Sequence, residues 1–121
     1  MSQAEQDRRI DYIEFRAGDL EPVKAFYSTA FGWTFTDYGP DYTSFEDGRI
    51  TGGFERTEGE ADRGTERPGP LVVIYAKDLG ELKRAVADAG GTVQEQIEFP
   101  GGRRFYFLDP AGNRLAVWTD N

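Results

Sequence analysis

The 121-residue sequence contains no cysteine and no histidine. Without cysteine, the chain cannot form a disulfide, bind a metal through a thiolate or use a cysteine nucleophile. Without histidine, it lacks the side chain that most often acts as a general base near neutral pH, and the usual ligand of zinc and iron sites. These two absences exclude several common classes of enzyme and metalloprotein.

Long hydrophobic runs and an excess of basic residues are also missing. No stretch of about 18 apolar residues is present, so we expect no membrane-spanning helix, and the polar segment 1–11 is not typical of a signal peptide. With 14 basic and 22 acidic residues, the chain has a net charge of -8 and would repel a phosphate backbone. We therefore expect a cytoplasmic protein with neither a nucleic-acid nor a membrane partner.

The sequence contains one pattern twice. Segment 10–32 returns as segment 69–91, at a constant offset of 59 residues. Each copy has an alternating run, then an acidic residue that can cap a helix (Asp19 or Asp78), then an amphipathic run that stops at glycine. This order predicts a strand followed by a helix, used twice within one domain.

Three further strands are expected after each helix, because aromatic and β-branched segments alternate there with Gly, Pro and Asp turns. The sequence thus predicts two βαβββ modules, over residues 10–56 and 71–119, in a single α+β domain. Residues 57–70 between them are charged and rich in Gly and Pro, and predict a mobile surface linker.

Several short motifs in this order are similar to a known family. They are Tyr-Ile-Glu-Phe at 12–15, Phe-Gly-Trp at 31–33, Asp-Leu at 78–79, and Phe-Leu-Asp-Pro-Ala-Gly-Asn at 107–113. With them the chain resembles the vicinal oxygen chelate superfamily, which includes glyoxalases, bleomycin resistance proteins and dioxygenases. The resemblance implies that the tandem modules form a curved, cup-shaped, eight-stranded mixed sheet with two helices on the outside. It also implies a homodimer.

In metal-dependent members of this superfamily, four positions in the cup carry His, Gln or Glu. The resemblance places these positions at Tyr12, Gly52, Leu71 and Ala116. A glycine and two apolar side chains cannot supply ligands, and only the tyrosine could contribute a phenolate. We therefore expect no metal and no cofactor, and neither glyoxalase I nor extradiol dioxygenase chemistry.

The expected lining of the cup is aromatic and apolar, with few charges, as in small-molecule pockets. Strand alternation places in it Tyr12, Glu14, Arg16, Phe54, Leu71, Val73, Tyr75, Arg114 and Trp118. Tyr42, Arg104 and Tyr106 are expected nearby, although a bulge would reverse their facing. Alternatively, the aromatic side chains fill this space as ordinary core. An unpaired Glu14 on this face would have a raised pKa and could act as a general base. Alternatively, it pairs with Arg16, Arg104 or Arg114, or reaches the mouth of the cup.

Three functions fit these residues. The first is metal-independent binding of a small planar or aromatic molecule, similar to the bleomycin-resistance branch. The second is a metal-free lyase or isomerase that uses Glu14, with Tyr12 or Tyr75 as its partner. The third is a structural module without a ligand. We expect the first.

Overall fold

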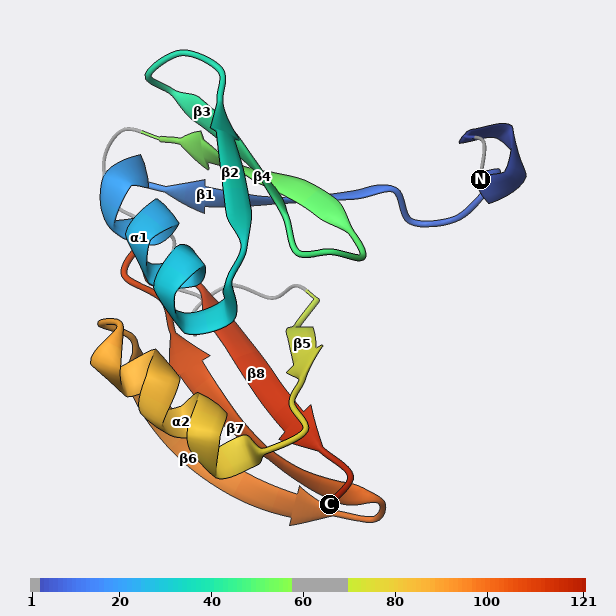
Figure 1. Ribbon diagram of the computed structural model, residues 1–121, viewed down its shortest axis with the longest axis vertical. Coiled ribbons are helices and arrows are strands. Elements are labelled where there is room, and N and C mark those ends of the chain that lie inside the picture. Colours follow the sequence, from blue (N-terminus) through green and yellow to red (C-terminus); the bar gives the residue numbers. More distant parts are fainter. Residues whose placement is uncertain (1–2, 58–69) are drawn as a thin grey trace.

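Two βαβββ modules follow one another along the chain, as predicted. The computed structural model describes residues 3–57 and 70–121 (Figure 1). The first module contains β1 (Tyr12–Ala17), α1 (Leu20–Phe31), β2 (Thr34–Asp37), β3 (Tyr42–Glu46) and β4 (Thr51–Arg56), after a short 3-10 helix, η1 (Gln3–Gln6). The second contains β5 (Val72–Tyr75), α2 (Leu79–Asp88), β6 (Thr92–Phe99), β7 (Gly102–Leu108) and β8 (Arg114–Thr119). The linker predicted over 57–70 lies, apart from its two end residues, outside the described residues.

The strands form two mixed sheets with the same topology. Their orders are β1-β4-β3-β2 and β5-β8-β7-β6, with β1–β4 and β5–β8 parallel and the other pairs antiparallel. This confirms the α+β class and the tandem modules. Within the described residues the eight strands are divided between two four-stranded sheets, and β1 and β5 each lie at a sheet edge.

Both helices begin and end where their capping residues predict. The Asp19 carboxylate accepts a hydrogen bond from the backbone N–H of Glu21, and Asp78 does the same for Glu81. Gly32 follows α1 with φ 77°, a left-handed conformation that favours glycine.

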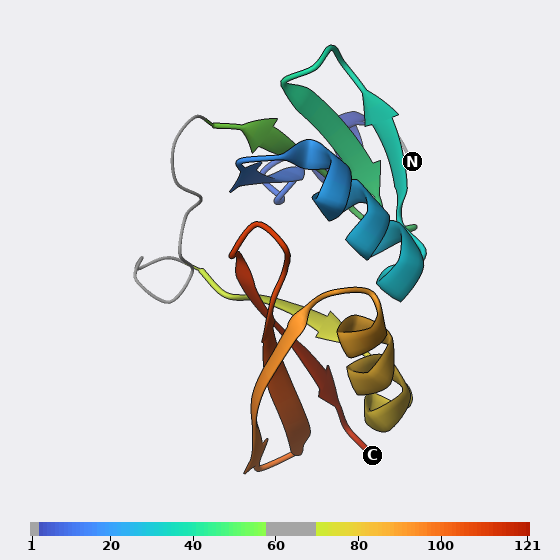
Figure 2. The ribbon, with the colours of Figure 1, turned by 90° about the vertical axis from the view of Figure 1, so that its left-hand side faces the viewer.

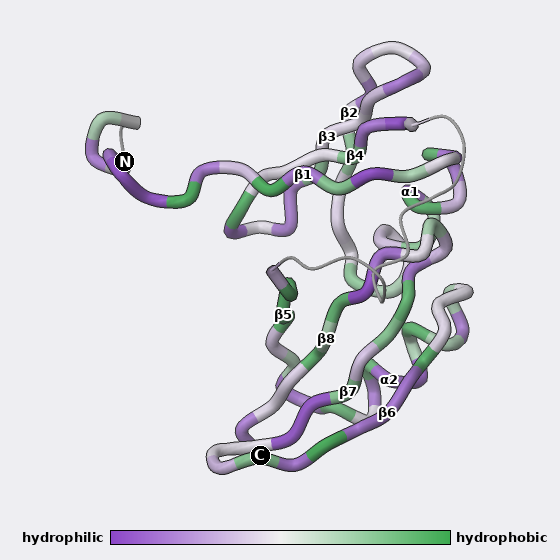
Figure 3. The backbone as a smooth tube through the Cα atoms, turned by 180° about the vertical axis from the view of Figure 1, so that it is seen from behind, coloured by the Kyte–Doolittle hydropathy of each residue, from purple (hydrophilic) through white to green (hydrophobic). Residues whose placement is uncertain are grey.

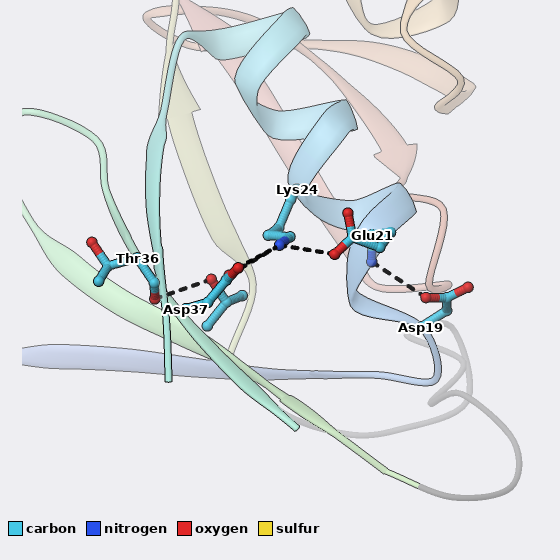
Figure 4. A network of polar contacts seen from close by, with 6 residues as sticks. Asp19, Glu21, Lys24, Thr36 and Asp37 are labelled. Atoms are coloured by element: carbon cyan, nitrogen blue, oxygen red, sulfur yellow. Dashed lines mark hydrogen bonds and ion pairs between the residues drawn. The ribbon is translucent and has the colours of Figure 1, made fainter. Parts of the chain in front are cut away.

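A charged cluster ties α1 to β2 at the surface (Figure 4). The ammonium group of Lys24 on α1 lies 2.9 Å from Asp37 Oδ1 and 2.9 Å from Glu21 Oε2. Hydrogen bonds to Glu21 and then to Asp37 raise the pKa of Lys24, so the cation is retained. Exposed pairs of this kind contribute little to stability.

Hydrophobic residues alternate with polar ones along β1, as the tube in Figure 3 shows. Ile13 and Phe15 point to the side where α1 packs, and the ring of Phe15 stacks on that of Phe54 at 5.0 Å. The opposite side of the sheet carries Tyr12 and Glu14. Each sheet therefore has a face that packs against its helix and a second face, which we call the helix-free face.

The two modules share one hydrophobic core. Helices α1 and α2 are in contact and lie on the same side of the molecule (Figure 2). Phe26 and Phe31 on α1 contact the ring of Phe107 on β7, at 5.9 and 5.8 Å. The buried side chains of both modules consequently form a single cluster.

The turn between β7 and β8 joins the second module to the first. Asp109 accepts a hydrogen bond from the buried Tyr27 hydroxyl of α1. The side-chain amide of Asn113 donates to the backbone carbonyl of Arg16 at 2.9 Å. These residues form the predicted turn, and their side chains also hold the second module against the first through hydrogen bonds.

No helix in the part of the chain that the structure describes is long and apolar enough to cross a membrane.

Candidate functional site

A polar cluster lies on the helix-free face of the first sheet. The hydroxyls of Tyr12 and Tyr42 are 2.6 Å apart, and the Tyr42 hydroxyl donates to Glu14 Oε1 at 3.0 Å. Both hydroxyls lie directly above Gly53, because a Cβ at that position would meet them. Gly53 thus makes room for the two tyrosine side chains.

The environment of Tyr42 fixes its role in this cluster. Removal from solvent raises the pKa of Tyr42, and the hydrogen bonds with Tyr12 and Glu14 raise it further. Tyr42 therefore stays protonated and acts as a hydrogen-bond donor. The partner of Glu14 is this tyrosine, not one of the three arginines considered from the sequence.

A second cluster lies on the helix-free face of the second sheet. Arg104 Nε donates to the Tyr106 hydroxyl at 2.8 Å, and the guanidinium of Arg114 lies 4.0 Å from the centre of the Tyr106 ring. The rings of Tyr75 and Trp118 meet edge to face at 5.4 Å. Arginine and aromatic side chains thus cover this face.

The structure does not bring these two predicted halves into contact. Within residues 3–57 and 70–121, no hydrogen bond, ion pair or ring contact joins the Tyr12 cluster to the Tyr106 cluster. Arg16 is exposed and follows Glu14 on the same strand face. Leu71 is half-buried and immediately precedes β5, and Val73 is exposed on β5 opposite Ala116.

The prediction that the Phe54 side chain faces the inside of the cup is wrong. In the β1–β4 ladder, Glu14 pairs with Gly53, so Gly53 shares the helix-free face with Glu14. Phe54 pairs with Phe15 on the opposite face and is completely buried in the core. Alternation along β4 gives Phe54 the same facing as Gly52, and both residues point to the core.

The residues at the four family metal positions do not fit a metal ion. Gly52 and Ala116 have no donor side chain, and Leu71 is apolar. The backbone of Gly52 also faces the core, where a Cβ would meet the carbonyl oxygen of Ile13. In the described part of the chain, no group of three or more Asp or Glu side chains is placed to hold a metal.

A cleft of about 770 Å³ lies between the modules, on the helix side of β1 and along the β5 edge. Its first-module wall is mainly apolar and aromatic, and consists of Ile10, Ile13, Phe15, Ala30, Phe31, Trp33, Phe45, Asp47, Arg49 and Ile50. Its second-module wall consists of residues 72–77 and Leu82. The size is within the range of ligand pockets, roughly 300–1,000 Å³.

The cleft contains only two of the predicted lining residues, Val73 and Tyr75. Sequence reasoning missed Trp33, Phe45 and Arg49, because the signals in their segments are those of strands and a turn and do not indicate contact with the second module.

Trp33 is stacked between Tyr27 and Phe45, with ring centres 4.5 and 4.4 Å apart, and both Trp33 and Phe45 are buried, so they form the packed back of the wall. The half-buried rings of Phe15 and Phe31 are the aromatic side chains of this wall that remain partly accessible. The alternation that placed Phe15 on the core face was the one available signal for this wall.

Comparisons with known proteins agree with this architecture. The anthracycline biosynthesis protein DnrV of Streptomyces peucetius is 31% identical over 124 aligned residues, which cover 88% of this chain and 45% of that protein. The chain thus spans about half the length of this curated relative.

Solved structures show the same fold at low sequence identity. The fosfomycin resistance protein FosX of Mesorhizobium loti superposes with a TM-score of 0.74 at 19% identity, covering 94% of this chain and 93% of that one. Lactoylglutathione lyase of Agrobacterium tumefaciens superposes with a TM-score of 0.70 at 24% identity, covering 93% of each chain.

The family assignment comes from the sequence match. The family model described as Glyoxalase/Bleomycin resistance protein/Dioxygenase superfamily matches residues 9–117, nearly the whole chain. The motifs that suggested this resemblance lie in β1, at the end of α1, at the start of α2 and in the β7–β8 turn, which position both clusters and the cleft. The chain belongs to the glyoxalase/bleomycin resistance protein/dioxygenase superfamily.

Proposed function

We propose that this protein binds a small, planar aromatic molecule in the inter-module cleft without the help of a metal ion. The observation that carries the proposal is the aromatic wall of a cleft of about 770 Å³, in which the half-buried rings of Phe15 and Phe31 are backed by the buried rings of Trp33 and Phe45. Aromatic side chains bury a large area and stack on flat ligands. The poor fit of the family metal positions supports metal-independent binding.

The curated relative supports the same ligand class. Its name places it in anthracycline biosynthesis, and anthracyclines are built on a planar fused-ring system. We propose a ligand of comparable shape for this chain, with one or more fused aromatic rings lying against Phe15 and Phe31.

A thermal-shift screen of the purified protein tests this proposal. Planar aromatic compounds and divalent metals are compared, each with and without EDTA. A ligand at 100 times its Kd should stabilise the folded state by about 2.7 kcal/mol, which is a shift of several degrees for a domain of this size. Shifts that EDTA abolishes would contradict metal independence. If no aromatic compound raises the unfolding temperature, a structural module without a ligand is favoured.

A second candidate function is supported by the Tyr12–Tyr42–Glu14 cluster. A carboxylate held by a protonated tyrosine can take up a proton while the tyrosine donates to a developing oxyanion, which is the chemistry of a metal-free lyase or isomerase. Once a ligand is found, its turnover would be followed against pH. Loss of turnover in Glu14→Gln supports the role of Glu14 as general base, and unchanged turnover rules it out.

We also propose that the protein forms a homodimer. The edge strands β1 and β5 expose Tyr12, Val73 and Tyr75, whose exposed fractions are 42%, 42% and 52%. Val73, Tyr75 and Ile10 also line the cleft, so a second copy packed on these residues would form a further wall of it. The segment before β1 extends away from the rest of the molecule (Figure 1), with Ile10 80% exposed. A second copy could cover these apolar surfaces. Light scattering at micromolar concentrations should give twice the monomer mass, and a monomer mass would refute the dimer.

A further inference from the structure

The charge of the inter-module cleft differs from that of the whole chain. The chain has 22 acidic and 14 basic residues. In the wall of the cleft, however, the charged residues are Asp47, Arg49 and Lys77, of which two are cations. These three residues together carry one net positive charge, which favours an anionic ligand over a cationic one.

The single acidic residue of the wall already has hydrogen-bond partners. Asp47 Oδ1 accepts the backbone N–H groups of Arg49 at 2.8 Å and of Ile50 at 2.7 Å. These bonds stabilise the turn between β3 and β4 and partly offset the negative charge of Asp47. The carboxylate is therefore held by its own turn and is not paired with a cation across the cleft.

The two cations come from different modules. Arg49 belongs to the β3–β4 turn, and Lys77 follows β5, so they approach the cleft from its two walls. Both are exposed. In the described residues, neither side chain takes part in an ion pair. The Tyr75 hydroxyl on the same wall donates to Asp120 at 2.9 Å, so it is already engaged.

We infer that the ligand of this cleft is an aromatic acid, whose rings lie against Phe15 and Phe31 and whose carboxylate, or a similar anion, is bound by Arg49 or Lys77. This inference rests on the proposed function and adds the charge of the ligand. Arginine can bind a carboxylate through two parallel hydrogen bonds, and lysine adds a flexible point charge. The apolar interior of the cleft would hold the rings.

Two probes of nearly the same shape test the inference. Anthracene-9-carboxylate is an anion at neutral pH, and 9-anthracenemethanol is its neutral counterpart. Calorimetric titration of the full chain should give a Kd at least about tenfold lower for the carboxylate, a difference of about 1.4 kcal/mol. This preference should shrink as salt is added, because exposed charges are screened.

Substitutions of the two cations test whether they cause the preference for the anionic probe. The double variant Arg49→Gln with Lys77→Gln should bind both probes with similar affinity, while the affinity for the neutral probe stays within about twofold of the unmodified chain. The control is Arg84→Gln, which removes one positive charge from the exposed surface of α2 outside the cleft. It should retain the full preference. Unchanged unfolding midpoints confirm that each variant is folded.

The outcomes separate the two proposals. Equal binding of both probes by the unmodified chain overturns the anion inference and leaves aromatic binding intact. A preference that survives in the double variant, or that Arg84→Gln abolishes, also overturns it, because the selectivity then arises elsewhere. Failure of both probes to bind overturns the proposed function together with this inference.

Discussion

The hydroxyl of Tyr27 donates a hydrogen bond of 2.9 Å to Asp109, across 82 residues of sequence and between the two modules. Both side chains are buried, at 0% and 4% exposure. The backbone N–H groups of Ala111 and Asn113 donate to the other oxygen of the same carboxylate, at 2.8 and 2.9 Å. The predicted turn motif therefore fixes how the modules pack, and with it the shape of the cleft between them.

Removal of the Tyr27 hydroxyl should destabilise the fold. In Tyr27→Phe the ring remains in the core, but the buried Asp109 loses one of its donors. We expect the free energy of unfolding in urea to fall by about 1–3 kcal/mol, the cost of leaving a buried polar group under-satisfied. Tyr38→Phe is the control, since Tyr38 is 64% exposed and surface changes usually stay within about 0.5 kcal/mol. If both variants lose the same free energy of unfolding, the Tyr27–Asp109 hydrogen bond does not stabilise the packing of the modules.

The same carboxyl should make stability depend on pH. Burial raises the pKa of Asp109 above its ordinary value of 3.8, and outweighs the hydrogen bonds that lower it. The folded state therefore holds this proton more strongly than the unfolded state, so the contribution of Asp109 to stability falls as pH rises above about 3.8.

Unfolding of the unmodified chain and of Asp109→Asn, compared at several pH values, isolates this contribution. The unmodified chain should lose stability relative to the variant as pH rises through the raised pKa of Asp109, because asparagine does not titrate. A stability difference that is constant with pH, or that changes in the opposite direction, would show that the pKa is not raised.

Two adjacent glycines should respond differently to the same substitution. In Gly52→Ala the added Cβ meets the backbone carbonyl of Ile13 and the ring of Phe45. We expect a loss of about 1–3 kcal/mol or more, typical of overpacking. In Gly53→Ala the Cβ meets the hydroxyl ends of Tyr42 and Tyr12, which can move aside. This variant should lose the tyrosine pair but less stability than Gly52→Ala.

Urea unfolding of both variants checks this order. Absorbance titration follows the tyrosines in Gly53→Ala, where the pKa of Tyr42 should fall toward its ordinary value once its partners are displaced. Greater destabilisation by Gly53→Ala than by Gly52→Ala would mean that the facing of β4 derived from the β1–β4 register is incorrect.

The sequence was sufficient to predict the modules and their helix ends. The repeat at offset 59, the caps Asp19 and Asp78 and the glycine after α1 are local signals, and local signals determine where helices begin and end. Alternation along β1 also separated Ile13 and Phe15 from Tyr12 and Glu14 correctly.

The facing of β4 and the position of the cleft could not be predicted in the same way. Phe54 was misplaced because the register between β1 and β4 depends on pairing across about 40 residues, and a shift of one residue reverses every side chain. The Tyr12–Tyr42 pair and the Tyr27–Asp109 bond are likewise long-range contacts without a sequence pattern. The cleft wall that contains Trp33 depends on how the two modules pack against each other, which no local sequence pattern encodes.

The most direct test of metal-free aromatic binding in the cleft uses the two tryptophans as position-specific reporters. Trp33 lies in the wall of the cleft, and Trp118 lies on the helix-free face of the second sheet. Their indole N–H signals in a proton–nitrogen correlation spectrum are assigned with the variant Trp118→Phe. Anthracene-9-carboxylate is then titrated in the presence of EDTA. Our account predicts that the Trp33 signal shifts saturably and the Trp118 signal stays in place. A shift of Trp118 alone, no shift of either signal, or a shift that requires added metal would contradict it.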